Sequence, residues 1–184
     1  NVISETPQSL CRIKGITPEK AAAISNEFRR MYGVREVVAW FTKYGLSAQQ
    51  AVTAYRAFGP HTVEALTQNP YLLCGDPLQL KFAQVDGIAA ALQFDSGSRL
   101  RVAAGLLYAL RHNANNGHTC LPRAKLLDST AKFLRVEPAS IEAGLDELLS
   151  TEDLRTRTYQ NIEYIYLPDL LSAEEDIAAR LGQL

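Results

Sequence analysis

A short motif that occurs twice constrains this chain more than any other feature of its sequence. Gly15-Ile16-Thr17-Pro18 and Gly45-Leu46-Ser47 align on their glycines, and Ala21 then aligns with Ala51. Gly59 begins a third, weaker copy. Glycine tolerates backbone conformations that other residues adopt at a cost, and Thr or Ser caps the start of a helix well. Each copy therefore predicts a tight turn that starts a helix.

The helix starts in these copies have recognisable capping patterns. Pro18 suits the first position of a helix, and Ser47-x-x-Gln50 matches a capping box. A helix N-terminus with exposed N–H groups is a ready anion site, so such a turn suits contact with phosphate. The same pattern is typical of a helical hairpin that only packs, and the local sequence leaves both interpretations open.

The first half of the chain predicts short helices and no strand. We expect the region 1–96 to form a helical domain in which Val52, Tyr55 and Phe58 are buried. Gly59-Pro60 and Gly75-Asp76-Pro77 mark breaks between its elements. The expected helices cover residues 18–31, 36–43, 48–58, about 60–68 and 82–92.

The pattern changes after residue 96. Helices are expected over 98–113, 123–134 and 138–149, the first with Leu100 on its inward face. Two alternating segments, 154–159 and 162–167, predict a β-hairpin. Three helices followed by a hairpin is the order of a winged helix, so we predict a winged-helix-like section over 97–170. A last helix over 171–184, capped by Ser172, is expected to lead towards a further domain.

Composition and charge exclude several classes of protein. The chain is 47% hydrophobic and 21% charged, and no apolar run approaches the roughly 20 residues that span a membrane. Three scattered cysteines predict neither a disulfide framework nor a zinc site, and favour a reducing, cytoplasmic location.

Charge is unevenly distributed along the chain, although the net charge is only −1. Residues 98–135 are basic, with seven Lys+Arg and one Asp, and residues 136–184 are acidic, with three Lys+Arg and eleven Asp+Glu. A uniformly basic nucleic-acid binder is excluded, whereas local basic patches are not. The chain starts at Asn1 without a signal pattern, and we interpret it as a fragment of a longer protein.

The sequence contains no recognisable catalytic, metal or cofactor site. It has neither the G-x-x-x-x-G-K-[ST] phosphate loop nor a G-x-G-x-x-G motif, so no ATP-binding pattern is present. The three histidines are isolated, and Asp86 and Asp95 form no convincing metal pair. The fragment alone is therefore not expected to be an enzyme.

The charge of the predicted winged-helix-like section differs from that of winged helices that bind in the DNA major groove. Its helix over 138–149 carries three acidic residues and no Lys or Arg, so phosphates would repel it. This section is expected to pack against another domain, unless DNA meets Arg155 and Arg157 on the hairpin or Arg99 and Arg101 on the first helix.

Four segments in order resemble the region preceding the motor in RecD-like (RecD/TraA) ATP-dependent DNA helicases. They are Tyr55 to Gly59 with Asn69-Pro70-Tyr71, Phe82-x-x-x-Asp86-x-Ile88-Ala89, Asp95 to Arg99, and Gly117-His118-Thr119 with Leu121-Pro122. The resemblance implies tandem helix-hairpin-helix units, a winged-helix-like section, and superfamily 1 motor domains that move 5′ to 3′ on single-stranded DNA. It also implies that the motors bind ATP and magnesium, and that single-stranded or junction DNA and the motor domains are the partners. Such proteins are often labelled exodeoxyribonuclease V alpha subunit, but no residue here supports nuclease activity.

The resemblance also places the candidate DNA contacts. The family pattern has Gly-hydrophobic-Gly, and Thr17 and Ser47 replace its second glycine; Gln79-Leu80-Lys81 replaces Gly-Ile-Gly before Phe82. The first two turns keep nearby cations and are the better candidates for non-specific phosphate contact. The complete candidate set is Lys14, Gly15, Thr17, Lys20, Lys43, Gly45, Ser47, Arg99, Arg101, Arg155 and Arg157. The alternative is a scaffold or docking module that does not bind DNA, which we expect if these basic residues fail to converge on one exposed face.

Overall fold

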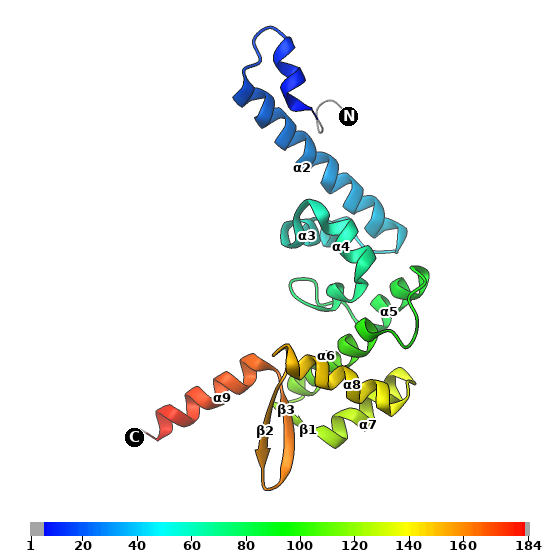
Figure 1. Ribbon diagram of the computed structural model, residues 1–184, viewed down its shortest axis with the longest axis vertical. Helices are drawn as coiled ribbons and strands as arrows, with labels where there is room; N and C mark the ends of the chain where they lie inside the picture. Colours follow the sequence, from blue (N-terminus) through cyan, green and yellow to red (C-terminus); the bar gives the residue numbers. More distant parts are fainter. Residues whose placement is uncertain (1–5, 183–184) are drawn as a thin grey trace. The chain divides into compact units, whose positions relative to one another are not determined.

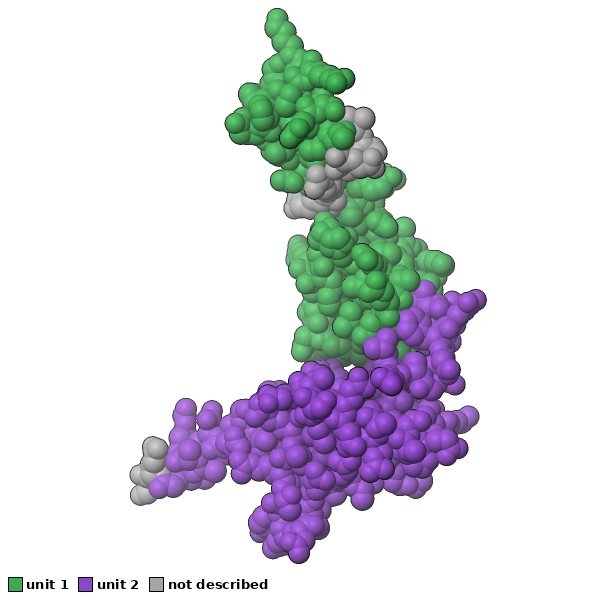
Figure 2. Space-filling view, viewed as in Figure 1, with its two compact units in different colours: residues 1–80 green, residues 81–184 purple. Residues whose placement is uncertain are grey.

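The computed structural model describes residues 6–182, apart from the side chains of residues 29–31. The chain divides into two compact units, residues 1–80 (unit 1) and residues 81–184 (unit 2), which are coloured separately in Figure 2. Each unit is described by itself.

Unit 1 is built from helices, as its sequence predicts. Its elements are the 3₁₀ helices η1 (Pro7–Arg12), η2 (Gly59–His61) and η3 (Pro70–Cys74) and the α-helices α2 (Pro18–Lys43), α3 (Ala48–Phe58) and α4 (Thr62–Gln68). Figure 1 shows η1 beside the first turns of α2 and α3 beside its last turns. The core between α2, α3 and α4 includes Phe41, Ala51, Ala54 and Leu66, none of which has measurable exposure.

One long helix replaces two of the helices that the sequence predicts. We expected separate helices over 18–31 and 36–43, whereas α2 is continuous from Pro18 to Lys43. Gly33 is the weak helix former between them, and a single interior glycine costs only about 1 kcal/mol relative to alanine. Packing against both η1 and α3 offsets that cost, so the helix continues.

The buried face of α3 also differs from the expected one. Ala51 and Ala54 are fully buried, whereas Val52, Tyr55 and Phe58 are only half-buried. The small residues of α3 therefore occupy its buried face. The larger side chains consequently lie at the edge of the contact.

The glycine turns have the geometry that the repeated motif predicts. Gly15, Gly45 and Gly59 have φ angles of +95°, +73° and +71°, in the region that side chains disfavour. Thr17 caps α2 and accepts a hydrogen bond from the Lys20 N–H.

Replacing Ser47 with alanine is expected to lower the free energy of unfolding of unit 1 by about 1 kcal/mol. Ser47 and Gln50 form a reciprocal capping box, in which Gln50 N–H donates to Ser47 Oγ at 3.2 Å and Ser47 N–H donates to Gln50 Oε1 at 2.8 Å. Thermal unfolding followed by the fluorescence of Trp40, the sole tryptophan, reports on this unit. Gln49→Ala alters an exposed neighbour outside the box and should leave the transition in place. Equal shifts for both variants would contradict the role of the cap.

Unit 2 combines helices with a small sheet. Its elements are α5 (Phe82–Ala91), α6 (Arg99–Asn115), β1 (Cys120–Pro122), α7 (Arg123–Leu134), α8 (Pro138–Ser150), β2 (Arg155–Tyr159), β3 (Ile162–Tyr166) and α9 (Pro168–Leu181). The strands are antiparallel in the order β1-β3-β2, with Leu121 opposite Ile165 and Ile165 opposite Thr156. The predicted hairpin is present, and its turn residues Gln160 and Asn161 both have positive φ, as a two-residue turn between twisted strands requires.

The helices of unit 2 meet at two glycines. A Cβ on Gly105 would lie 2.6 Å from Leu134 Cδ1 in α7, and a Cβ on Gly144 would lie 2.5 Å from Val102 Cγ1 in α6. Helices α7 and α8 therefore both pack closely on α6. The face of α6 that they cover is centred on Val102 and Leu106, so Leu100 lies at its margin and is 37% exposed, contrary to the sequence expectation.

Three further details differ from the predicted organisation. Helix α9 begins at Pro168 rather than at Ser172, whose hydroxyl donates to the Pro168 carbonyl inside the helix. Strand β1 was not expected. Helix α5 groups with unit 2, because Phe82 packs its ring against Tyr108 and Phe133, whereas the sequence placed it before a boundary at residue 96. The domain limits and the winged-helix assignment stay predictions.

Candidate nucleic-acid interface

The first hairpin, residues 13–20, presents exposed donors beside two cations. Gly15 and Thr17 are exposed, and their backbone N–H groups have no hydrogen-bond partner among the described residues. Lys14 and Lys20 flank them and are also exposed. Unpaired N–H groups at the start of a helix, together with lysines, form an arrangement that suits a phosphate.

One side chain of the first hairpin opposes an anion. The Thr17 hydroxyl forms a hydrogen bond with the Glu19 carboxylate, which lowers the pKa of Glu19. A phosphate at this hairpin would experience repulsion from Glu19 as well as attraction to Lys14 and Lys20.

The second hairpin, residues 41–50, uses most of its donors internally. Gly45 N–H donates to the Thr42 carbonyl at 3.1 Å, and Leu46 N–H donates to the Phe41 carbonyl at 2.9 Å. The capping box occupies Ser47 N–H. The Lys43 ammonium lies 5.2 Å from the centre of the Tyr44 ring, in cation–π contact. The two copies of the motif thus share a shape but differ in their capacity to bind phosphate.

The two hairpins lie at opposite ends of α2 (Figure 1). A helix of 26 residues is about 39 Å long at 1.5 Å per residue. Lys14 and Lys20 therefore cannot share one phosphate with Lys43. Within unit 1, the predicted basic residues form two separate sites.

Arg101 has a structural role in unit 2. Its guanidinium forms two hydrogen bonds with the Asp86 carboxylate, at 2.8 and 2.9 Å, and also donates to the carbonyls of Ser96 and Leu134. Only 14% of the Arg101 side chain is exposed. These contacts join α5, the following turn and the end of α7, so this arginine is not available as an exposed DNA contact.

The remaining candidate arginines of unit 2 lie on its surface. Arg155 pairs with Glu152 at 3.1 Å and Arg157 pairs with Glu175 of α9, so acidic neighbours offset both charges. Arg99, at the first position of α6, is exposed.

The acidic helix α8 is partly neutralised. Arg123 lies 2.6 Å from Asp146 and 3.7 Å from Glu142, and the hydrogen bond to Asp146 raises the pKa of Arg123. Arg123 also lies 3.7 Å from Glu163 of β3. Arg123 therefore links α7 both to α8 and to strand β3 of the sheet.

Residues 6–182 contain no cluster of three His, Cys, Asp or Glu side chains that could hold a metal ion. None of the described helices is both long and apolar enough to cross a membrane.

Sequence reasoning missed a groove in unit 1 between α2 and α3. Phe28, Tyr32, Tyr55, Arg35 and Arg56 contribute to its lining, and its volume is about 830 Å³. The spacing of Phe28 and Tyr32 at i and i+4 was the available signal, because such residues share one face of a helix. The groove depends on the continuity of α2, which the sequence pattern does not indicate.

Comparison with known proteins finds similarity to RecD2 helicases. A family model described as the ATP-dependent RecD2 DNA helicase HHH domain matches residues 30–120. The ATP-dependent RecD2 DNA helicase of Deinococcus radiodurans is 24% identical over the whole of this chain, which spans 27% of the length of that relative. Residues 30–120 therefore match the helix-hairpin-helix domain of ATP-dependent RecD2 DNA helicases.

Proposed function

We propose that this chain is an accessory region of a RecD-like DNA helicase and holds DNA by its phosphates. The observation that carries this proposal is the first hairpin, where exposed N–H groups lie between Lys14 and Lys20. The relationship to the RecD2 helicase domain supports DNA as the polyanion.

This contact is expected to position DNA without recognising its base sequence. The N–H groups of Gly15 and Thr17 donate to a phosphate oxygen, the start of α2 adds its dipole, and the lysines add charge. Contacts of this kind fix DNA without distinguishing bases. Lys43, Gly45 and Ser47 form a weaker second contact, because their hairpin has fewer N–H groups to offer. By this proposal, ATP and magnesium act at the motor domains of the helicase, and the motors are partners of this region.

Replacing Lys14 and Lys20 with glutamate is expected to weaken binding of single-stranded DNA roughly tenfold. The reason is the loss of two phosphate contacts, each of which contributes about −0.7 to the slope of log K against log salt concentration on a single strand. Fluorescence anisotropy with a labelled oligonucleotide and its duplex, titrated at several salt concentrations, measures both the affinity and the slope.

The matched control is the double change Lys125→Glu with Lys132→Glu, which alters net charge equally on exposed residues of α7. An equal loss of affinity in the control would contradict a defined site at the first hairpin. Lys43→Glu is expected to have the smaller effect. Glu19→Gln provides the opposite test, since removing that carboxylate should tighten binding.

The distribution of charge favours a second candidate function, a docking scaffold within the same helicase. The two hairpins are separated by the length of α2, Arg101 is engaged with Asp86, and Arg155 and Arg157 pair with acids. The lysines of unit 1 thus form two separate sites, and acidic neighbours offset three of the four candidate arginines of unit 2. No DNA binding by the chain even at low salt would select this alternative.

We also propose that α6, α7 and α8 with their sheet form a winged-helix-like module that packs against protein. The element order α6-β1-α7-α8-β2-β3 supports the winged-helix assignment. The acidic α8 disfavours entry into the major groove.

A further inference from the structure

We propose that the groove between α2 and α3 of unit 1 binds the bases of single-stranded DNA by stacking. This site is distinct from the phosphate contacts of the hairpins. We call it the aromatic groove and define it by Phe28, Tyr32, Arg35, Tyr55 and Arg56, with two valines completing the lining. The choice of DNA as ligand rests on the proposed function.

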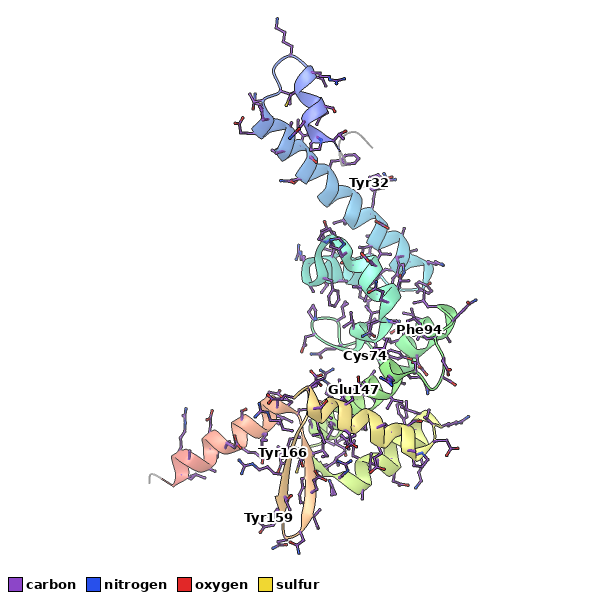
Figure 3. The ribbon with its side chains drawn as sticks, viewed as in Figure 1. Tyr32, Cys74, Phe94, Glu147, Tyr159 and Tyr166 are labelled. Carbon is purple, nitrogen blue, oxygen red and sulfur yellow. The ribbon has the colours of Figure 1, made fainter. Side chains whose placement is uncertain are left out.

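Two rings of the aromatic groove already form a stacked pair. The centres of the Phe28 and Tyr32 rings are 5.4 Å apart, with an angle of 24° between their planes. Tyr32 is 59% exposed, and Figure 3 shows it projecting from α2. An exposed ring at the end of a stacked pair offers a free face on which a base can continue the stack.

Gly33 of α2 lets Tyr55 of α3 form the other wall of the aromatic groove. A Cβ on Gly33 would lie 2.9 Å from Cε2 and 3.1 Å from the hydroxyl oxygen of Tyr55. Because Gly33 lacks this atom, the Tyr55 ring lies directly against the backbone of α2. The absence of a side chain there brings aromatic rings from both helices to one groove.

The charge of the aromatic groove selects among possible occupants. Arg35 and Arg56 line it from the two helices and are both exposed, and none of the described residues that line it is acidic. A ligand with flat apolar groups and negative charge fits this combination. Single-stranded DNA has both, since its unpaired bases stack on aromatic rings while its phosphates approach arginines. A duplex keeps its bases stacked on each other and cannot offer them to the groove.

Replacing Tyr32 with alanine is expected to weaken binding of a single-stranded oligonucleotide roughly tenfold. Stacking does not release counterions, so the slope of log K against log salt concentration should be unchanged. An oligonucleotide of equal length made of abasic sites should bind the variant and the parent chain equally. Anisotropy titrations of the complete 184-residue chain measure all three quantities.

The matched control is Tyr159→Ala, which removes a tyrosine of similar exposure, 66%, at the tip of the β2–β3 hairpin (Figure 3). This variant should bind single strands as the parent chain does. A second variant, Arg35→Gln with Arg56→Gln, should lower the salt slope while it keeps the preference for bases over abasic sites.

The outcome separates this inference from the proposed function. Unchanged single-strand affinity in Tyr32→Ala, or equal binding of abasic and base-containing strands by the parent chain, would overturn the inference and leave the aromatic groove to a protein partner. The proposed phosphate contact has its own test: it would be contradicted if the variant Lys14→Glu with Lys20→Glu left the slope of log K against log salt concentration unchanged.

Discussion

Replacing Arg101 with methionine is expected to lower the free energy of unfolding of unit 2 by about 3 kcal/mol. Methionine keeps much of the aliphatic length but removes the guanidinium, so Asp86 remains partly buried, at 28% side-chain exposure, without its main partner. The Leu134 carbonyl at the end of α7 loses a donor as well. Removing one member of a partly buried, hydrogen-bonded ion pair costs more than the intact pair contributes, which makes this one of the two largest effects that we expect.

Amide hydrogen exchange read by mass spectrometry measures this effect on peptides of α5, α6 and α7. The control is Arg99→Met, two residues earlier on the same helix, where the side chain is exposed and the change should be within about 0.5 kcal/mol of zero. Equal protection in the two variants would show that Arg101 does not hold these helices together. The variant with both Arg101→Met and Asp86→Leu should recover part of the loss, because it also removes the carboxylate that has lost its two hydrogen bonds to Arg101.

The role of Arg101 shows what the sequence could not reveal. Asp86 and Arg101 are separated by 15 positions and by a turn, and no local pattern indicates that their side chains meet. From the sequence alone, Arg101 was therefore a candidate for contact with DNA. The distinction between a surface cation and a structural one depends on tertiary contacts.

Features that depend on local chemistry were predicted well. The glycine turns follow from the positive φ that such turns need, and the Ser47 capping box follows from residue types at fixed spacing. The β-hairpin follows from alternation around Gln160-Asn161. Each of these elements is determined by neighbours in sequence.

Features that depend on which helix faces meet were predicted less well. Helix α3 buries Ala51 and Ala54 instead of its larger residues, and α2 continues through Gly33. Both differences arise from close packing of helices on small residues, which hydrophobic periodicity alone does not indicate. The aromatic groove is a product of the same two differences, since the displaced Tyr55 lies against Gly33. The aromatic groove could therefore not be predicted from local sequence patterns.

Replacing Gly144 with alanine is expected to destabilise unit 2 by about 2 kcal/mol. The added Cβ would lie 2.5 Å from Cγ1 of Val102, which is only 2% exposed. A β-branched residue in a helix has one strongly preferred rotamer, so Val102 cannot turn away cheaply. Relief then requires α8 to move away from α6, with a loss of packing around Leu106 and Leu145. This penalty exceeds the gain of about 1 kcal/mol that alanine gives over glycine in a helix.

The sign of the effect is what identifies its cause. Gly87→Ala makes the same change inside α5, where a Cβ would have no atom within 4 Å, so the helix gain alone should stabilise unit 2 by about 1 kcal/mol. Exchange rates in α6 and α8 of each variant measure the two changes on one scale. Stabilisation by both substitutions would mean that Val102 yields and that the close approach of α8 to α6 is not required. Opposite signs would show that Gly144 is needed for its lack of a side chain, and that this contact sets how closely α8 packs on α6.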